Sequence, residues 1–144
     1  MNDTPFFLDM NVPMYAAGRA HPYKESCVWV LTEIANSRLD VVIDVEIVQE
    51  ILYRYGAIQR WQVGQEMAKN LLDLIPVVMP VTIEDMKVAL TLFAQNGSQG
   101  VAARDLLHAA VMQNHQLTHI ISTDRHFDQI EGIARLDPQA LFVA

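Results

Sequence analysis

The 144-residue chain has a single cysteine, Cys27, which rules out an internal disulfide and supplies too few thiolates for a structural zinc site. Its apolar neighbours favour a place in the core. Basic residues are also scarce, because ten Lys and Arg stand against seventeen Asp and Glu, and the formal net charge is −7. This deficit argues against binding nucleic acid by broad phosphate neutralisation. It is compatible with a nuclease whose acids hold metal ions.

Long apolar runs are absent as well. No hydrophobic stretch approaches the ~18 residues of a membrane-spanning helix, and the amino-terminal segment lacks a basic region followed by an apolar one. We therefore expect a soluble, cytoplasmic protein with no membrane partner. A hydrophobic content of 51% and a charged content of 19% are typical of a compact globular chain, and the length favours one domain over residues 1–144.

Short apolar segments of strand type alternate with longer segments in which apolar residues recur at helical spacing. The expected strands are 6–8, 41–43, 77–79, 120–121 and, at one edge, 132–136. The expected helices are 22–37, a segment from Asp44 to about Gly56, 61–74, 83–95 and the Ala-rich stretch around Asp105. Such alternation, with crossovers long enough to be right-handed, predicts a parallel sheet flanked by helices.

Acidic residues follow two of the expected strands and lie on two of the helices. Asp9 comes directly after the first strand, and Asp124 follows the fourth across a Ser-Thr pair. The carboxyl ends of parallel strands form the crevice where such sheets bind ligands, and Glu50 and Asp105 would reach it from helices. Several carboxylate oxygens in one cleft are suitable ligands for Mg²⁺ or Mn²⁺.

Histidines offer a different chemistry. His115 and His119 are four residues apart, with His108 and His126 nearby, but the first two flank the turn after a helix and no third soft ligand accompanies them. A zinc site is therefore disfavoured. A metal-free, histidine-driven ribonuclease would need a paired acid and base, which the pattern does not locate.

Four segments together resemble the acidic motifs of the PIN-domain ribonucleases, in particular the VapC-type toxins. They are Phe-Leu-Asp-Met-Asn at 7–11, Glu-Ile-Leu-Tyr-Arg-Tyr at 50–55, Ala-Arg-Asp-Leu-Leu-His-Ala-Ala at 103–110 and Ile-Ile-Ser-Thr-Asp-Arg-His-Phe-Asp at 120–128. The resemblance extends to 80–85 and 136–138. It implies a three-layer α/β/α sandwich with a central parallel sheet and cleavage of RNA that depends on Mg²⁺ or Mn²⁺ and leaves 5′-phosphate and 3′-hydroxyl ends. For many small members it also implies a homodimer silenced by a small antitoxin that inserts into the cleft.

The resemblance also implies roles for individual residues. The catalytic and metal-binding acids would be Asp9, Glu50, Asp105 and Asp124, with Asn11 and Ser122 or Thr123 orienting water or ligand carboxylates. Two positions depart from the family pattern. Asp44 replaces an expected small hydroxyl residue, so it either caps the next helix or adds charge to the site. Asp128 either stabilises a helix start or faces the cleft.

Other functions remain to be weighed against this one. A non-catalytic PIN-fold module could keep its acids for a metal or a partner, and a housekeeping RNA-processing nuclease would carry the same site. A phosphatase on a similar sheet would use Asp9 as nucleophile, but it would want a second Asp where Asn11 stands.

The same pattern suggests contact surfaces. The predicted helix 61–74 carries Trp61, Met67, Leu71 and Leu72, an apolar set that a dimer or an antitoxin would cover. The cations expected to meet RNA phosphate are Arg19, Lys24, Arg54, Arg60, Arg104 and Arg125, and ordinary surface placement accounts equally well for several of them.

Overall fold

The computed structural model of the chain describes residues 4–143 and contains a five-stranded sheet in the order β3-β2-β1-β4-β5. Every neighbouring pair of strands is parallel. The strands are β1 (Phe6–Leu8), β2 (Val41–Asp44), β3 (Val78–Met79), β4 (His119–Ile121) and β5 (Ala134–Leu136). Four fall on predicted strands with their ends within a residue, and β5 occupies the second half of the predicted segment 132–136.

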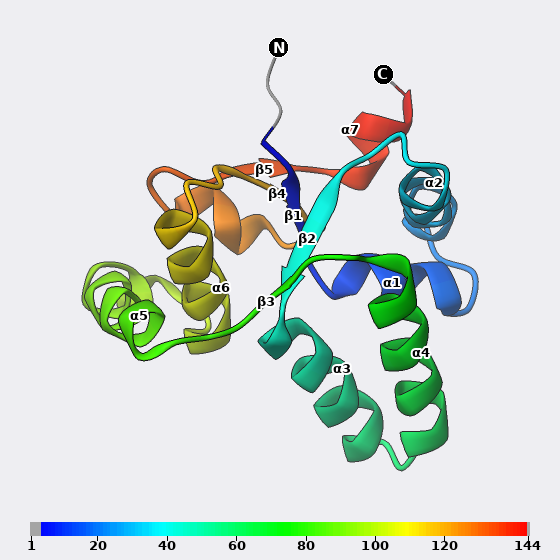
Figure 1. Cartoon of the computed structure of the whole chain (residues 1–144), viewed down its shortest axis with the longest axis horizontal. Helices are drawn as coiled ribbons and strands as arrows, with labels where there is room; N and C mark the ends of the chain where they lie inside the picture. Colours follow the sequence, from blue (N-terminus) through cyan, green and yellow to red (C-terminus); the bar gives the residue numbers. More distant parts are fainter. Residues whose placement is uncertain (1–3, 144) are drawn as a thin grey trace.

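Helices flank the sheet, as predicted, and give a three-layer α/β/α arrangement (Figure 1). They are α1 (Asn11–Ala17), α2 (Lys24–Ala35), α3 (Val45–Ala57), α4 (Trp61–Leu74), α5 (Ile83–Asn96), α6 (Ala103–Asn114) and α7 (Pro138–Val143), with 3₁₀ turns η1 (Gly97–Gln99) and η2 (Arg125–Gln129). In Figure 1, α5 and α6 lie on one side of the sheet, α1, α2 and α7 on the other, and α3 and α4 form a hairpin below.

Two helices are not predicted by the sequence pattern, and proline explains both. The segment around Pro13 is typical of a turn, but Pro13 lies in the first turn of α1, where a missing N–H costs nothing. Likewise Pro138, two residues after the last strand, begins α7. The predicted helix at 22–37 is shorter than expected at both ends, since α2 covers only Lys24–Ala35.

The core lies between the sheet and the helices. Phe7, Leu8, Ile120 and Ile121 in the central strands are fully buried. Cys27 is buried too, as expected, and burial raises the pKa of its thiol to about 11. Among residues 4–143, no helix combines the length and apolar character needed to cross a membrane.

Candidate functional site

The neighbouring strands β1 and β4 bring two of the predicted residues together at their carboxyl ends. Asp9 follows β1 and is only 4% exposed. Its Oδ2 accepts hydrogen bonds from Ser122 Oγ at 2.7 Å and from Asn11 Nδ2 at 3.1 Å, while its Oδ1 accepts one from the main-chain N–H of Met10 at 2.8 Å. Asn11 Nδ2 also lies 3.2 Å from Ser122 Oγ, so the two predicted supporting residues hold Asp9 in one orientation.

Ser122 also fixes the start of the loop that carries Asp124. Its Oγ accepts the main-chain N–H of Asp124 at 3.0 Å. Thr123 contributes a main-chain N–H, which donates to Asn11 Oδ1 at 3.3 Å. Asp124 Oδ1 accepts the main-chain N–H of His126 at 2.9 Å, which caps η2, and lies 2.9 Å from His126 Nδ1.

The other two acids come from helices on either side of these strand ends. Glu50 lies on the buried face of α3 between Ile47 and Ile51 and is 4% exposed, so it is not part of a solvated helix surface. Asp105 lies in the first turn of α6 and is 8% exposed. Both line a cleft of about 750 Å³ together with Asp9 and Asp124. The structure thus brings all four predicted acids to one cleft.

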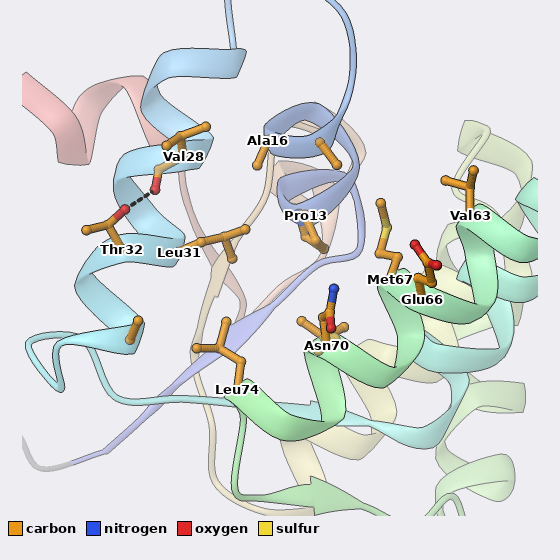
Figure 2. A pocket seen from close by; sticks show the side chains of 13 residues that line it. Pro13, Ala16, Val28, Leu31, Thr32, Val63, Glu66, Met67, Asn70 and Leu74 are labelled. Atoms are coloured by element: carbon orange, nitrogen blue, oxygen red, sulfur yellow. Dashed lines mark hydrogen bonds between the residues drawn. The ribbon is translucent and has the colours of Figure 1, made fainter.

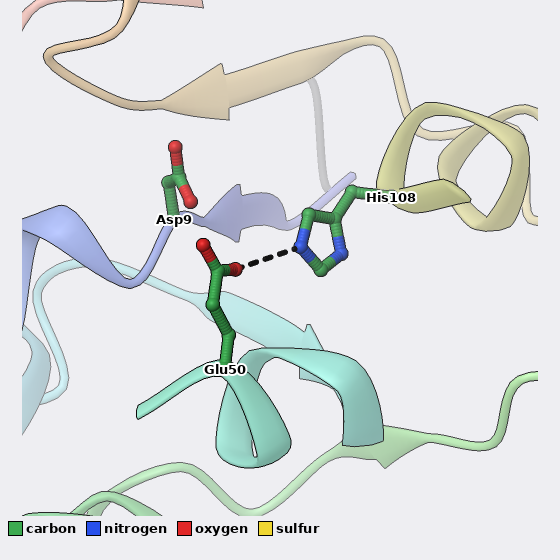
Figure 3. Close-up of side chains that lie close together, drawn as sticks. All are labelled: Asp9, Glu50 and His108. Carbon is green, nitrogen blue, oxygen red and sulfur yellow. Dashed lines mark hydrogen bonds and ion pairs between the residues drawn. The ribbon is translucent and has the colours of Figure 1, made fainter. Parts of the chain in front are cut away.

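A buried histidine beneath the cleft is not predicted as part of the site. His108 is fully buried on α6; its Nδ1 lies 2.8 Å from Asp44 Oδ2 and its Nε2 lies 3.4 Å from Glu50 Oε1. Figure 3 shows Asp9, Glu50 and His108 pointing toward one another, and each offers a ligand atom within 4.8 Å of the others. The signal available in the sequence is spacing, because residues three apart on a helix share a face and His108 is three after Asp105.

The two open positions are resolved by their partners. Asp44 caps α3, since its Oδ1 accepts the N–H of Ile47 at 3.0 Å, and its Oδ2 contacts His108, so it acts on the site indirectly. Asp128 forms a two-point ion pair with Arg135 at 3.0 and 3.2 Å. Within residues 4–143 the lining of the cleft does not include Asp128.

The charges in the site perturb one another. Burial, and then the charge of Asp9, raise the pKa of Asp105 to about 7. Burial likewise raises the pKa of Asp9. Burial by itself would lower the pKa of His108, but hydrogen bonds to Asp44 and Glu50 outweigh it and raise the value to about 10, so that His108 is an imidazolium at neutral pH.

Glu50 is the best-compensated acid of the four. Its Oε2 lies 3.3 Å from Arg104 Nη1 and 3.9 Å from Arg54 Nη2, and both arginines line the cleft. Burial opposes ionisation of Glu50, but the hydrogen bond from His108 and the charge of Arg104 prevail and lower its pKa. Carboxylates and cations are therefore interleaved in this cleft, an arrangement suited to binding a divalent ion and a phosphate side by side.

Comparison with known proteins identifies the family. A model of the PIN domain matches residues 6–133. The chain belongs to the PIN-domain family. It is 36% identical over 129 residues to Ribonuclease VapC13 of Mycobacterium tuberculosis, with 90% of this chain and 97% of that protein covered.

Solved structures share the fold. It is similar to that of Mycobacterium tuberculosis VapC20, described as a sarcin-ricin loop cleaving toxin, with a TM-score of 0.71, 13% identity and coverage of 86% and 93% of the two chains. It is also similar to a chain of a toxin-antitoxin complex from Klebsiella pneumoniae, with a TM-score of 0.62, 15% identity and coverage of 92% and 97%.

Proposed function

We propose that this protein is an endoribonuclease that cleaves RNA phosphodiester bonds with the help of a divalent metal ion, as the toxin of a type II toxin–antitoxin pair. The observation that carries the proposal is the convergence of Asp9, Glu50, Asp105 and Asp124, from four separate segments, on one cleft. Membership of the PIN-domain family and the ribonuclease relative support RNA as the substrate.

The donor set fits Mg²⁺ or Mn²⁺. The groups available in the cleft are mainly carboxylate oxygens, which hard cations prefer, and the raised pKa of Asp105 reflects burial and neighbouring negative charge that a cation would offset. We assign the four acids as metal-binding and catalytic groups. When bound, such an ion lowers the pKa of a coordinated water and stabilises negative charge on the reacting phosphate.

The remaining polar residues orient this machinery. Ser122 and Asn11 fix the Asp9 carboxylate, and the N–H of Thr123 holds Asn11 in turn. His108 holds Glu50 from below through Oε1, which leaves Oε2 facing the arginines of the cleft. Because these partners restrict the carboxylates of Asp9 and Glu50, the oxygens of these two acids are placed before the metal and RNA bind.

An apolar groove is a candidate binding surface for an antitoxin-like protein partner. It has a volume of about 580 Å³ and lies between α1, α2 and α4 (Figure 2). Its lining includes Pro13, Ala16, Leu31, Met67 and Leu74. Helix α1 also contributes residues to the acidic cleft, so a segment bound in the groove would lie close to the active centre. We propose that the antitoxin covers this groove.

Self-association is assigned to a different surface from the one expected from the sequence. On α4, Trp61 and Leu72 are exposed, but Met67 and Leu71 are buried and line the groove. The longest exposed apolar stripe in the described chain is instead on α5. Its members, spaced three, four and three residues apart, are Ile83, Met86, Leu90 and Phe93, with exposed fractions of 46–69%. We propose that two copies pair through this stripe.

The function is tested by RNA cleavage with and without metal. Purified protein should cleave single-stranded RNA in Mg²⁺ or Mn²⁺, leaving 5′-phosphate and 3′-hydroxyl ends, and EDTA should stop the reaction. Asp9→Asn and Asp105→Asn should abolish cleavage, whereas Asp128→Asn, which removes an acid outside the cleft, should not. Cleavage that persists in EDTA, or undiminished activity in Asp9→Asn, would contradict the assignment.

A further inference from the structure

An exposed tyrosine beside an arginine of the acidic cleft has no role in the mechanism above. Tyr53 lies on α3 next to Arg54 and is 57% exposed. The guanidinium of Arg104 lies over its ring, 5.5 Å from the centroid. The same guanidinium is ion-paired with Glu50 at 3.3 Å. Arg104 therefore connects the ring of Tyr53 directly to one of the four acids.

This contact holds both partners in place. Arg104 extends from the first turn of α6 and is fixed at one end by a buried carboxylate. A guanidinium over an aromatic face is a favourable cation–π contact, which restrains the ring even though most of it remains in water. An aromatic ring that is both exposed and restrained offers a ready surface for a planar ligand.

The charge of the protein makes such a surface useful. With a net charge of −7, the chain lacks the basic excess by which many proteins hold RNA through its phosphates. Stacking of unpaired bases on aromatic rings and guanidinium groups supplies affinity without net charge, and proteins that bind single strands rely on it. Trp61 and Phe93 are also exposed aromatics, but within the described residues neither contacts an arginine of the cleft in this way.

We propose that Tyr53, braced by Arg104, is a stacking platform for an unpaired base of the RNA, next to the phosphate that is cleaved. The proposal rests on the ribonuclease function and makes it more specific, because it assigns Tyr53 as the residue that holds one unpaired base of the substrate beside the cleft. Arg54 and Arg104 would contact the phosphates on either side of the stacked base.

Kinetics on a short single-stranded RNA provide the first test. Tyr53→Leu should raise KM by about 10- to 100-fold with little change in kcat, the range expected for loss of one stacked base, while Tyr53→Phe should retain wild-type values. Trp61→Leu, which removes an exposed aromatic outside the cleft, is the matched control. Replacing the stacked base by an abasic ribose should raise the KM of wild type equally and leave that of Tyr53→Leu unchanged.

A binding measurement separates this proposal from the function on which it rests. In an Asp9→Asn background, which blocks cleavage, RNA carries the fluorescent base 2-aminopurine at each position in turn. At one position, its fluorescence should be quenched by the Asp9→Asn protein and by the same protein carrying Tyr53→Phe. The protein carrying Tyr53→Leu should not quench it. If wild type cleaves no RNA but this pattern is found, the ribonuclease proposal fails and the platform stands.

Two results would overturn the platform. One is equal KM and equal quenching in wild type and Tyr53→Leu, which would show that no base stacks on the ring. The other is a change of oligomeric state in Tyr53→Leu with unchanged RNA binding, which would place Tyr53 in a protein interface.

Discussion

Removing one buried charge from the cleft should stabilise the metal-free protein. Asp105 is 8% exposed, and its pKa rises from 3.8 to about 7 through burial and the charge of Asp9. A change of one in pKa corresponds to about 1.4 kcal/mol, so ionising Asp105 costs the native state about 4 kcal/mol. Asp105→Asn keeps the shape and removes this cost. In EDTA at pH 8 the variant should melt higher than wild type, by on the order of 10 °C for a chain of this size.

The stabilisation by Asp105→Asn should depend on pH. Because the pKa of Asp105 is higher in the folded protein than in the unfolded chain, the native state binds the extra proton between pH 4 and 7. The stability of wild type should therefore fall as pH rises through this window and change little from this group above it. The advantage of Asp105→Asn should vanish near pH 4 and be complete at pH 8.

Thermal melts of both proteins at pH 4, 6 and 8, with and without Mn²⁺, measure this directly. Mn²⁺ should raise the melting temperature of wild type with concentration and that of Asp105→Asn less, since the variant lacks a ligand. Asp128→Asn is the control, because it removes an exposed acid whose partner is Arg135. A variant that is less stable than wild type in EDTA at pH 8, or an equal gain from Mn²⁺ in both, would refute the shared-site reasoning.

Other parts of the structure can be tested by single substitutions. His108→Gln should lower the melting temperature by several degrees and weaken RNA cleavage, because it leaves the buried carboxylates of Asp44 and Glu50 without their cation. In wild type, the stabilisation from His108 should be complete below about pH 6.5 and should be lost as the pH rises through about 10. Leu90→Glu should convert a dimer to a monomer in light scattering, because it places a charge in the exposed stripe of α5, whereas Thr91→Glu on the same helix should not. Leu31→Glu should block binding of the antitoxin in calorimetry while the free chain still cleaves RNA, because the groove is apolar and separate from the acids; retained antitoxin binding would reject the groove.

Local sequence pattern predicted the features that depend on a few adjacent residues. An acid directly after a buried strand, as at Asp9, lies at the carboxyl edge of a parallel sheet. The local spacing of Thr82 and Asp85 is likewise enough to form a capping box, in which Asp85 Oδ2 accepts the N–H of Thr82 at 2.9 Å. Pattern also located the convergence of the four acids, because each lies at a strand end or on the inner face of a helix.

Features that depend on pairing between distant segments were not predictable in the same way. Nothing local to His108 shows that it will meet Asp44, 64 residues away, and its position among Ala and Leu residues is equally typical of an ordinary core histidine. The exposure of helix α4 was misjudged for a related reason. Periodicity identifies an apolar face but not how exposed it is, because Met67 and Leu71 are only 9% and 3% exposed in the lining of the groove while the residues of the α5 stripe are 46–69% exposed.

The burial of His108 determines which charges an RNA would meet in the cleft of this acidic protein. His108 is balanced by Asp44 beneath the cleft, so the lining itself carries four carboxylates against the two guanidinium groups of Arg54 and Arg104. Without metal, ionisation of all four acids would leave an excess of two negative charges that repels a phosphate, and both arginines lie against Glu50. If the proposed metal site is correct, a divalent ion held by these acids would offset this excess and compete with Arg54 and Arg104 for Glu50, which would leave the two guanidinium groups available for phosphate. The proposed function therefore predicts that metal binding and RNA binding are coupled through Glu50, the one acid of the four that contacts both arginines and the buried histidine within the described chain.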